Sequence, residues 1–137
     1  MFKSFKHVAV FSLLIVSLLL SSGCRTAPIR NIENSPVITS SQAYPDMQKI
    51  GDAIIKAGAK LGWRMTVEEV GLITGKLFVR THRAEVKIVF NDKSYSIIYK
   101  DSQNLKYDAE KSKIHHQYNN WVVNLDNAIR RELADMK

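Results

Sequence analysis

Apolar and polar positions repeat with two different periods along this chain, and the period changes from one segment to the next. From Asp46 to Gly62, apolar residues recur at spacings of three and four, which predicts an amphipathic helix. The same spacing returns more strongly from Ile114 to Met136. Between them, four runs alternate apolar and polar side chains with a period of two, which is typical of strands with one packed face: 63–68, 73–80, 84–90 and 95–99.

The connections between these strand runs are short. Gly71 interrupts the first pair, and Asn91 to Lys93 is a turn signal before the last. Short links between consecutive strands favour an antiparallel meander. We therefore predict an α+β two-layer sandwich, in which a four-stranded antiparallel meander carries both helices on one face. Residues 101–113 are interpreted as a polar loop, with Ser112 as the cap of the last helix.

The first 23 residues follow a different pattern. Lys3 and Lys6 precede an uncharged apolar run over residues 8–20, and small residues occupy positions 21–23. A basic start, a short apolar run and small residues before a cleavage point are typical of a secretory signal peptide. A membrane-spanning helix needs about 20 apolar residues, so this run is too short to cross a bilayer comfortably.

The stretch LLLSSGC, which ends at Cys24, resembles the lipobox of bacterial lipoproteins. The resemblance implies that Cys24 becomes the mature N-terminus and carries a diacylglycerol and an N-acyl chain, with no other cofactor. Ser21 departs from the family, in which leucine is more usual at that position. The alternative is an ordinary signal peptide with an incidental cysteine.

The residue after the cysteine bears on the membrane that the resemblance implies. In enterobacterial lipoproteins an aspartate at this position favours retention in the inner membrane, and here the residue is Arg25. By that analogy we expect the periplasmic face of the outer membrane. The inner membrane and the cell surface stay open as alternatives, because sorting rules differ among bacteria.

Residues 24–45 separate the leader from the patterned region. They contain all three prolines, Pro28, Pro36 and Pro45, among many Ser, Thr and Asn residues and without a sustained period. This composition predicts a flexible tether. The expected organisation is a signal peptide over 1–23, the lipidated cysteine and tether over 24–45, and one domain over 46–137. A short strand over Ser35 to Thr39, docked on the domain edge, is the alternative.

Charge and cysteine content narrow the classes of partner. The net charge is +7, and the 20 Lys and Arg include Lys3 and Lys6 of the leader, against 13 Asp and Glu. This modest excess permits an anionic partner such as lipopolysaccharide or peptidoglycan. We expect a membrane contact through the lipid and no nucleic acid, because the expected location excludes it. Cys24 is the sole cysteine, so the domain has no disulfide.

One compact basic cluster is the candidate ligand-binding patch. It contains Arg80, His82 and Arg83 at a strand junction, and Lys100 extends it if the strands pair as a meander. Guanidinium groups match the geometry of phosphates and carboxylates. The alternative interpretation is a solvated hairpin turn.

Other polar clusters do not predict catalysis or metal binding. His115 and His116 are adjacent, and adjacent helical residues point about 100° apart, which makes them a poor pair of metal ligands. Ser102 could join a histidine and an aspartate in a hydrolase triad, but no GxSxG motif surrounds it. We therefore assign no catalytic residue and no metal ligand.

Two resemblances concern the domain. The element order and the motif AGxxxGW, which ends at Trp63, are similar to the helix-grip-type domains of the lipoproteins of the outer-membrane β-barrel assembly machine. The segments 97–108 and 114–129 resemble those of a family of small periplasmic lipoproteins. Neither resemblance brings functional residues with it.

The expected function is a non-enzymatic binding or scaffold module of the cell envelope. We expect the open sheet face or an exposed edge strand to meet a protein partner, since strand addition is a common recognition mode. A module that binds lipopolysaccharide or peptidoglycan through the basic patch is the second hypothesis. A small hydrolase is the third.

Overall fold

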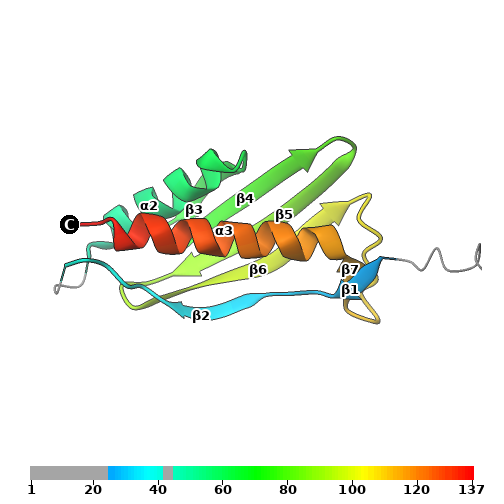
Figure 1. Ribbon diagram of the computed structural model, residues 1–137, viewed down its shortest axis with the longest axis horizontal. Helices are drawn as coiled ribbons and strands as arrows, with labels where there is room; N and C mark the ends of the chain where they lie inside the picture. The colour runs from blue at the N-terminus through cyan, green and yellow to red at the C-terminus, as the bar shows by residue number, and fades with distance from the viewer. Residues whose placement is uncertain (1–24, 42–44) are drawn as a thin grey trace, which may run out of the picture.

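The computed structural model describes residues 25–41 and 45–137, so the expected signal peptide and Cys24 lie outside the described residues. Two helices, a five-stranded antiparallel sheet and a two-stranded sheet make up the described part, which confirms the α+β class (Figure 1). In chain order the elements are β1 (Thr26–Pro28), β2 (Ile32–Pro36), α2 (Met47–Lys60), β3 (Arg64–Glu69), β4 (Leu72–Val79), β5 (His82–Phe90), β6 (Ser94–Gln103), β7 (Lys113–His115) and α3 (His116–Ala134).

The order of strands in the large sheet is β2-β6-β5-β4-β3. The four strands from β3 to β6 are consecutive antiparallel neighbours, as the short connections predict. The prediction of four strands is wrong in number, because β2 adds a fifth strand along the free edge of β6. The two edges of the sheet are therefore β2 and β3.

The prediction of a flexible tether is wrong for residues 26–36, which form β1 and β2. β1 pairs with β7, and β2 pairs with β6 so that Ser35 lies opposite Tyr95. Ser35 is buried, and the buried carboxylate of Asp126 accepts hydrogen bonds from the Tyr95 hydroxyl at 2.5 Å and the Ser35 hydroxyl at 3.5 Å. Polar pairing of this kind leaves no period-two signal. The alternative strand over 35–39 therefore overlaps β2, but its bounds are shifted by three residues toward the C-terminus.

α2 packs closely on the edge of the sheet. It begins after Asp46, whose carboxylate accepts a hydrogen bond from the backbone N–H of Gln48. A Cβ atom at Gly58 would lie 2.4 Å from the sulfur of Met65, so only glycine lets the helix approach β3 without displacing that side chain. The predicted helix over 46–62 is confirmed with slightly narrower bounds.

α3 is longer and has an unexpected start. The predicted cap, Ser112, lies outside the helix, and the segment interpreted as a loop contains the end of β6 and the first residue of β7. His115 is the cap instead: its Nδ1 accepts the backbone N–H of Gln117 at 3.2 Å. Since β7 leads straight into α3, the strand pairing with β1 fixes where the helix begins.

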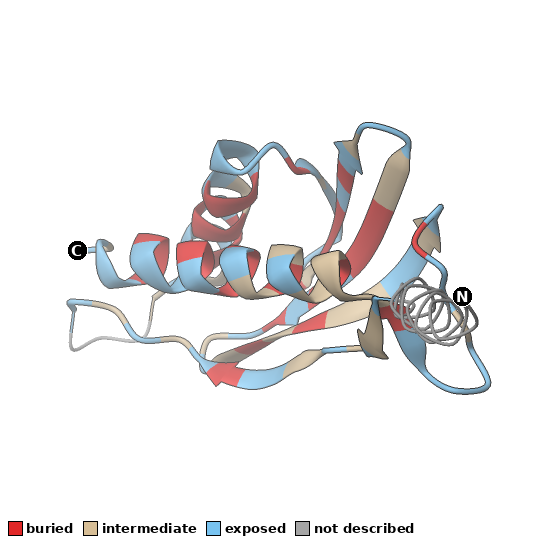
Figure 2. Cartoon of the chain, turned by 45° about the vertical axis from the view of Figure 1, so that its right-hand side comes forward, coloured by how far each residue is buried: buried red, intermediate tan, exposed pale blue. Residues whose placement is uncertain are grey.

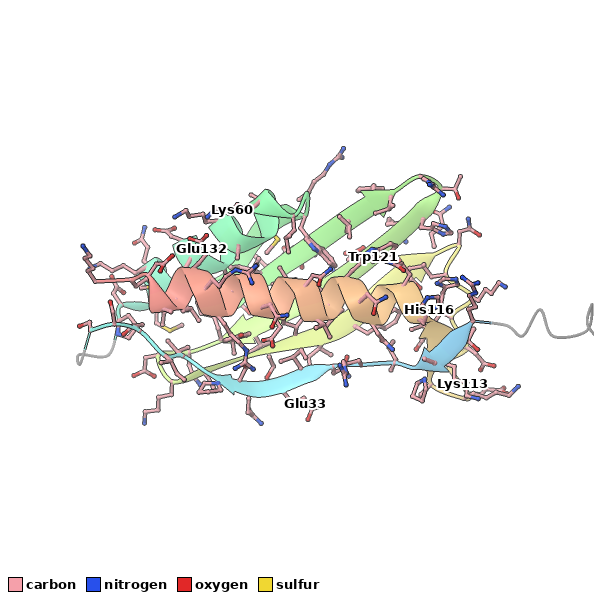
Figure 3. All side chains as sticks on the ribbon, viewed as in Figure 1. Glu33, Lys60, Lys113, His116, Trp121 and Glu132 are labelled. Atoms are coloured by element: carbon pink, nitrogen blue, oxygen red, sulfur yellow. The ribbon has the colours of Figure 1, made fainter. Side chains whose placement is uncertain are left out.

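Both helices lie on the same side of the sheet (Figures 1 and 2), and in the view of Figure 1 they run in roughly opposite directions. Lys56 and Lys60 of α2 pair with Glu132 of α3 across their junction (Figure 3). Burial of each large apolar side chain beneath them stabilises the fold by roughly 1.5–3 kcal/mol. The fully enclosed apolar residues of this core include Ile50, Ile54, Ile73, Val86, Ile88, Ile97, Ile114, Val122, Leu125 and Ile129.

Candidate functional site

The predicted basic patch is largely neutralised. Glu85 is 6% exposed and accepts ion pairs from Arg83 at 2.7 Å, Lys100 at 2.8 Å and Lys76 at 3.6 Å. Burial acts to raise the pKa of Glu85, but the hydrogen bond from Lys100 and the surrounding positive charges outweigh it and hold that pKa below its usual range. Two of the predicted ligand-binding residues, Arg83 and Lys100, therefore already have a carboxylate partner.

The other predicted residues lie around the turn between β4 and β5. Arg80 occupies this turn with a φ of 56°, as the hairpin alternative expects. The His82 ring donates from Nδ1 to the backbone carbonyl of Asn104 at 2.6 Å, because a carbonyl can only accept. Arg83 forms a second ion pair, with Asp101 at 2.6 Å, and this hydrogen bond lowers the pKa of Asp101. The four predicted residues therefore do not form a cluster of unpaired cations, because one lies in the turn and two are in ion pairs.

The residues weighed for hydrolysis and metal binding do not assemble. The Ser102 hydroxyl lies 2.8 Å from the Tyr99 hydroxyl and is paired with it. Over residues 25–41 and 45–137, no group of three or more His, Cys, Asp or Glu side chains is arranged to hold a metal ion.

An apolar groove of about 400 Å³ opens between the first half of α2 and the end of β3, and we call it the α2–β3 groove. The β3–β4 turn closes its end. Gly71 in that turn has a φ of 86°, and a Cβ there would lie 2.9 Å from the carbonyl oxygen of Phe90, so this position requires glycine. The groove is lined by Asp46, Met47, Gln48, Gly51, Asp52, Ile55, Val67, Glu69, Val70, Gly71, Ile73 and Phe90.

Two features of the α2–β3 groove are typical of a binding surface. Val67 and Val70 are 58% and 85% exposed, although both are β-branched apolar residues. Three carboxylates, Asp46, Asp52 and Glu69, line the same groove in a chain whose net charge is +7. The groove therefore combines an apolar interior with an acidic lining.

The outer edge of β3 runs beside this groove. Within the described ranges, β3 has one strand neighbour, β4, so one side of its backbone is unpaired. Its pairing with β4 is regular from Arg64 to Val67 and then shifts at a bulge. The opposite edge strand, β2, is shorter and contains a register shift, Pro36, and Asn34 at positive φ, which suit an edge that resists further pairing.

A second surface gathers all three described histidines, and we call it the histidine end. It contains Arg25, His82, Lys106, His115 and His116. The ring centroids of His82 and His115 are 6.5 Å apart, and those of His115 and His116 are 4.7 Å apart. The backbone N–H of His116 donates to the carbonyl of Arg25 at 2.9 Å, so the surface includes the first described residue. His116 lies at the end of the molecule occupied by β1 and β7 (Figure 3).

The three imidazoles differ in the hydrogen bonds that they form. The Nδ1 atoms of His82 and His116 donate to the carbonyls of Asn104 and Arg25. Nδ1 of His115 is instead an acceptor, from the N–H of Gln117. Partial burial lowers the pKa of His115, and the charges of His116, Lys106, His82 and Arg25 lower it further.

Sequence reasoning missed both surfaces. The period-two alternation over 63–68 puts Val67 on the predicted packed face of its strand, but the side chain is exposed; Val70, an apolar residue beside the turn glycine Gly71, is a signal of exposed apolar surface. The histidine end joins residues about 90 positions apart, such as Arg25 and His116, through a strand pairing that the sequence pattern does not show.

Comparisons with known proteins identify no relative. No protein-family model matches the chain, and no similar protein was found among curated proteins or among solved structures. In the part of the chain that the structure describes, neither helix has the length and apolar character to span a bilayer.

Proposed function

We propose that this chain is a lipid-anchored, periplasm-facing module of the cell envelope, which binds an extended segment of a protein partner in the α2–β3 groove. The anchor part rests on the lipobox resemblance at Cys24, and the outer membrane is its expected site. The single observation that carries the binding part is the juxtaposition of an apolar groove with the unpaired edge of β3.

The geometry suits β-strand addition. An extended segment that pairs with β3 gains main-chain hydrogen bonds, and alternate side chains then enter the adjoining groove. The regular stretch from Arg64 to Val67 supplies the unpaired backbone groups. The exposed Val67 and Val70 supply apolar surface for the partner's side chains. No catalytic group is required for this function.

The lining of the groove indicates the chemistry of the partner. Asp46, Asp52 and Glu69 favour a segment that carries Lys or Arg beside its apolar residues. An anionic envelope ligand fits this surface poorly. At the predicted basic patch, Arg83 and Lys100 are already paired with Glu85 and Asp101, so these two residues do not supply free charge for such a ligand.

Site-specific photo-crosslinking in cells tests this proposal. The crosslinker is placed at Val70 in the groove and, in a matched strain, at Phe78, which is 50% exposed on a neighbouring strand. We expect one discrete adduct from Val70 and none from Phe78. The double change Asp52→Lys with Glu69→Lys should lower the adduct yield by roughly tenfold, because like charges across an interface are strongly unfavourable.

The control variant is Glu33→Lys, which makes the same kind of charge reversal on β2, away from the groove (Figure 3). It should leave the yield within about twofold, because screening weakens the effect of charges beyond a Debye length. Equal adducts from Val70 and Phe78, or recovery of the free monomer alone, would contradict partner binding in this groove.

A further inference from the structure

The histidine end lies where the expected lipid anchor would enter the domain. β1 begins at Thr26, and Thr26 pairs with His115, so the described chain is held by the domain from Arg25 onward. Only one peptide bond separates Arg25 from Cys24. If Cys24 carries acyl chains, as the proposed function states, the short link between Cys24 and Arg25 holds the histidine end at the lipid surface.

The charge at this end matches such a surface. The charged side chains in the segments that form it are Arg25, Arg80, Lys106, Lys111 and Lys113 against Asp108 and Glu110, before any histidine is protonated. Lys111 lies 3.7 Å from Asp108, which neutralises one pair and leaves an excess of cations. The charged groups that lower the pKa of His115 are basic, and they come from four segments: His82 from β5, Lys106 from the loop after β6, His116 from α3, and Arg25 before β1.

We propose that the histidine end binds the phosphate groups of anionic lipid headgroups. The His82 and His116 rings each hold a backbone carbonyl through Nδ1. Lys106 and Arg25 supply the positive charge beside these rings, and a cationic N–H donates to a phosphate oxygen in a charge-assisted hydrogen bond. The proposal rests on the lipid anchor of the proposed function and not on the groove.

The consequence is a fixed orientation. The start of α2 and the C-terminus lie at the end of the molecule away from β1 and β7 (Figure 1). Contact between the histidine end and the headgroups would therefore present the α2–β3 groove away from the membrane, where a periplasmic partner can reach it.

Competitive partition between two kinds of vesicle separates the headgroup contact from the anchor. The full chain is produced in cells, extracted in detergent and dialysed with equal amounts of phosphatidylcholine vesicles and vesicles that also contain phosphatidylglycerol. Acyl chains contribute equally to both populations, so the distribution ratio reports the headgroup contact alone. We expect a ratio of roughly fivefold or more in favour of the anionic vesicles, because each Lys or Arg near an anionic surface contributes at that level.

Variants assign the contact to this end. Lys106→Glu, and separately Lys113→Glu, should lower the ratio by roughly fivefold or more. Lys49→Glu makes the same charge change on α2, at the other end, and should leave the ratio within about twofold.

Each outcome bears on a separate statement. Protein that stays in solution with neutral vesicles would contradict the anchor, whatever the ratio. An anchored protein that distributes equally between the two vesicle populations would overturn the headgroup proposal. Equal effects of Lys106→Glu and Lys49→Glu would overturn it as well, since they would show only a response to net charge.

Discussion

The two helices begin at opposite ends of the molecule, and their first residues differ as the surrounding surfaces do. α2 starts after Asp46, a carboxylate in the lining of the apolar α2–β3 groove. α3 starts after His115, an imidazole in the middle of the histidine end. A carboxylate at a helix N-terminus is favoured by the helix dipole near neutral pH, whereas an imidazole that gains a proton loses its acceptor and adds an unfavourable charge. Mild acid should therefore destabilise the start of α3 at the histidine end but not the start of α2 at the groove.

This difference suits two separate functions within one small domain, partner binding at one end and membrane contact at the other. The acidic, apolar end has an unpaired strand edge and suits a protein segment that is apolar and basic. The basic end is held together by short strands that begin at Thr26, next to the expected lipid attachment. β2 joins the two ends along the edge of the sheet, so its attachment determines whether they move as one body.

The largest expected effect comes from breaking that attachment. Asp126→Ala removes the carboxylate that Tyr95 and Ser35 share, and leaves the buried Tyr95 hydroxyl without this partner. We expect the free energy of unfolding to fall by about 2 kcal/mol, because an unpaired buried polar group costs about that much. Denaturant unfolding measures the loss. Limited proteolysis should show early cleavage near Arg30, between β1 and β2.

The matched control lies at the other end. Asp52→Ala removes an exposed carboxylate from the groove lining and should change the free energy of unfolding by less than about 0.5 kcal/mol. If both variants lose the same stability, or if Asp126→Ala is cleaved no faster near Arg30 than the wild type, the view of β2 as the link between the ends is wrong.

A smaller effect, of about 1 kcal/mol, should appear as pH dependence at the histidine end. The pKa of His115 is lowered in the folded state from an ordinary value of 6.5, so the unfolded chain binds more protons in this range. The free energy of unfolding must then decrease as pH falls through and below about 6.5. Glu85 and Glu132, whose pKa values are also lowered, lose their stabilising contribution only at and below the carboxyl range, near 4.5, so they do not contribute here.

His115→Asn sharpens this prediction. Asparagine keeps a side-chain acceptor for the N–H of Gln117 but does not titrate, so unfolding curves between about pH 7.5 and about pH 5.5 should become superimposable. Asp46→Asn, the equivalent change at the start of α2, should leave the pH dependence of the wild type intact. A variant His115→Asn that retains the full dependence would assign it to another group.

The contrast between the ends also shows which elements of the fold the sequence pattern can predict. Periodicity predicted α2, α3 and the four strands from β3 to β6, because apolar residues recur on one side of each, and in all of these elements except β3 that side is buried. It missed β2, because Ser35 is held there by the carboxylate of Asp126 and the hydroxyl of Tyr95 and not by apolar burial. Hydrogen bonds between distant segments therefore leave no periodic pattern of apolar residues in the sequence.

The candidate surfaces were harder to predict for a related reason. The basic patch was visible as a cluster in sequence, but Glu85, in the middle of it, pairs with Arg83 and Lys100 once the strands align. The groove depends on how closely α2 approaches β3, and the histidine end depends on the pairing of β1 with β7. These are distances between elements, which the pattern within each element does not encode.

The orientation of the domain on its membrane is the central claim, and quenching by a lipid-attached quencher tests it most directly. With Cys24 acylated as we propose, a cysteine introduced at Ser112, beside β7, or at Val70, in the groove, is the sole thiol for a fluorescent label. In anionic vesicles we predict strong quenching at Ser112 and weak quenching at Val70. Equal quenching at both positions, or stronger quenching at Val70, would contradict the account.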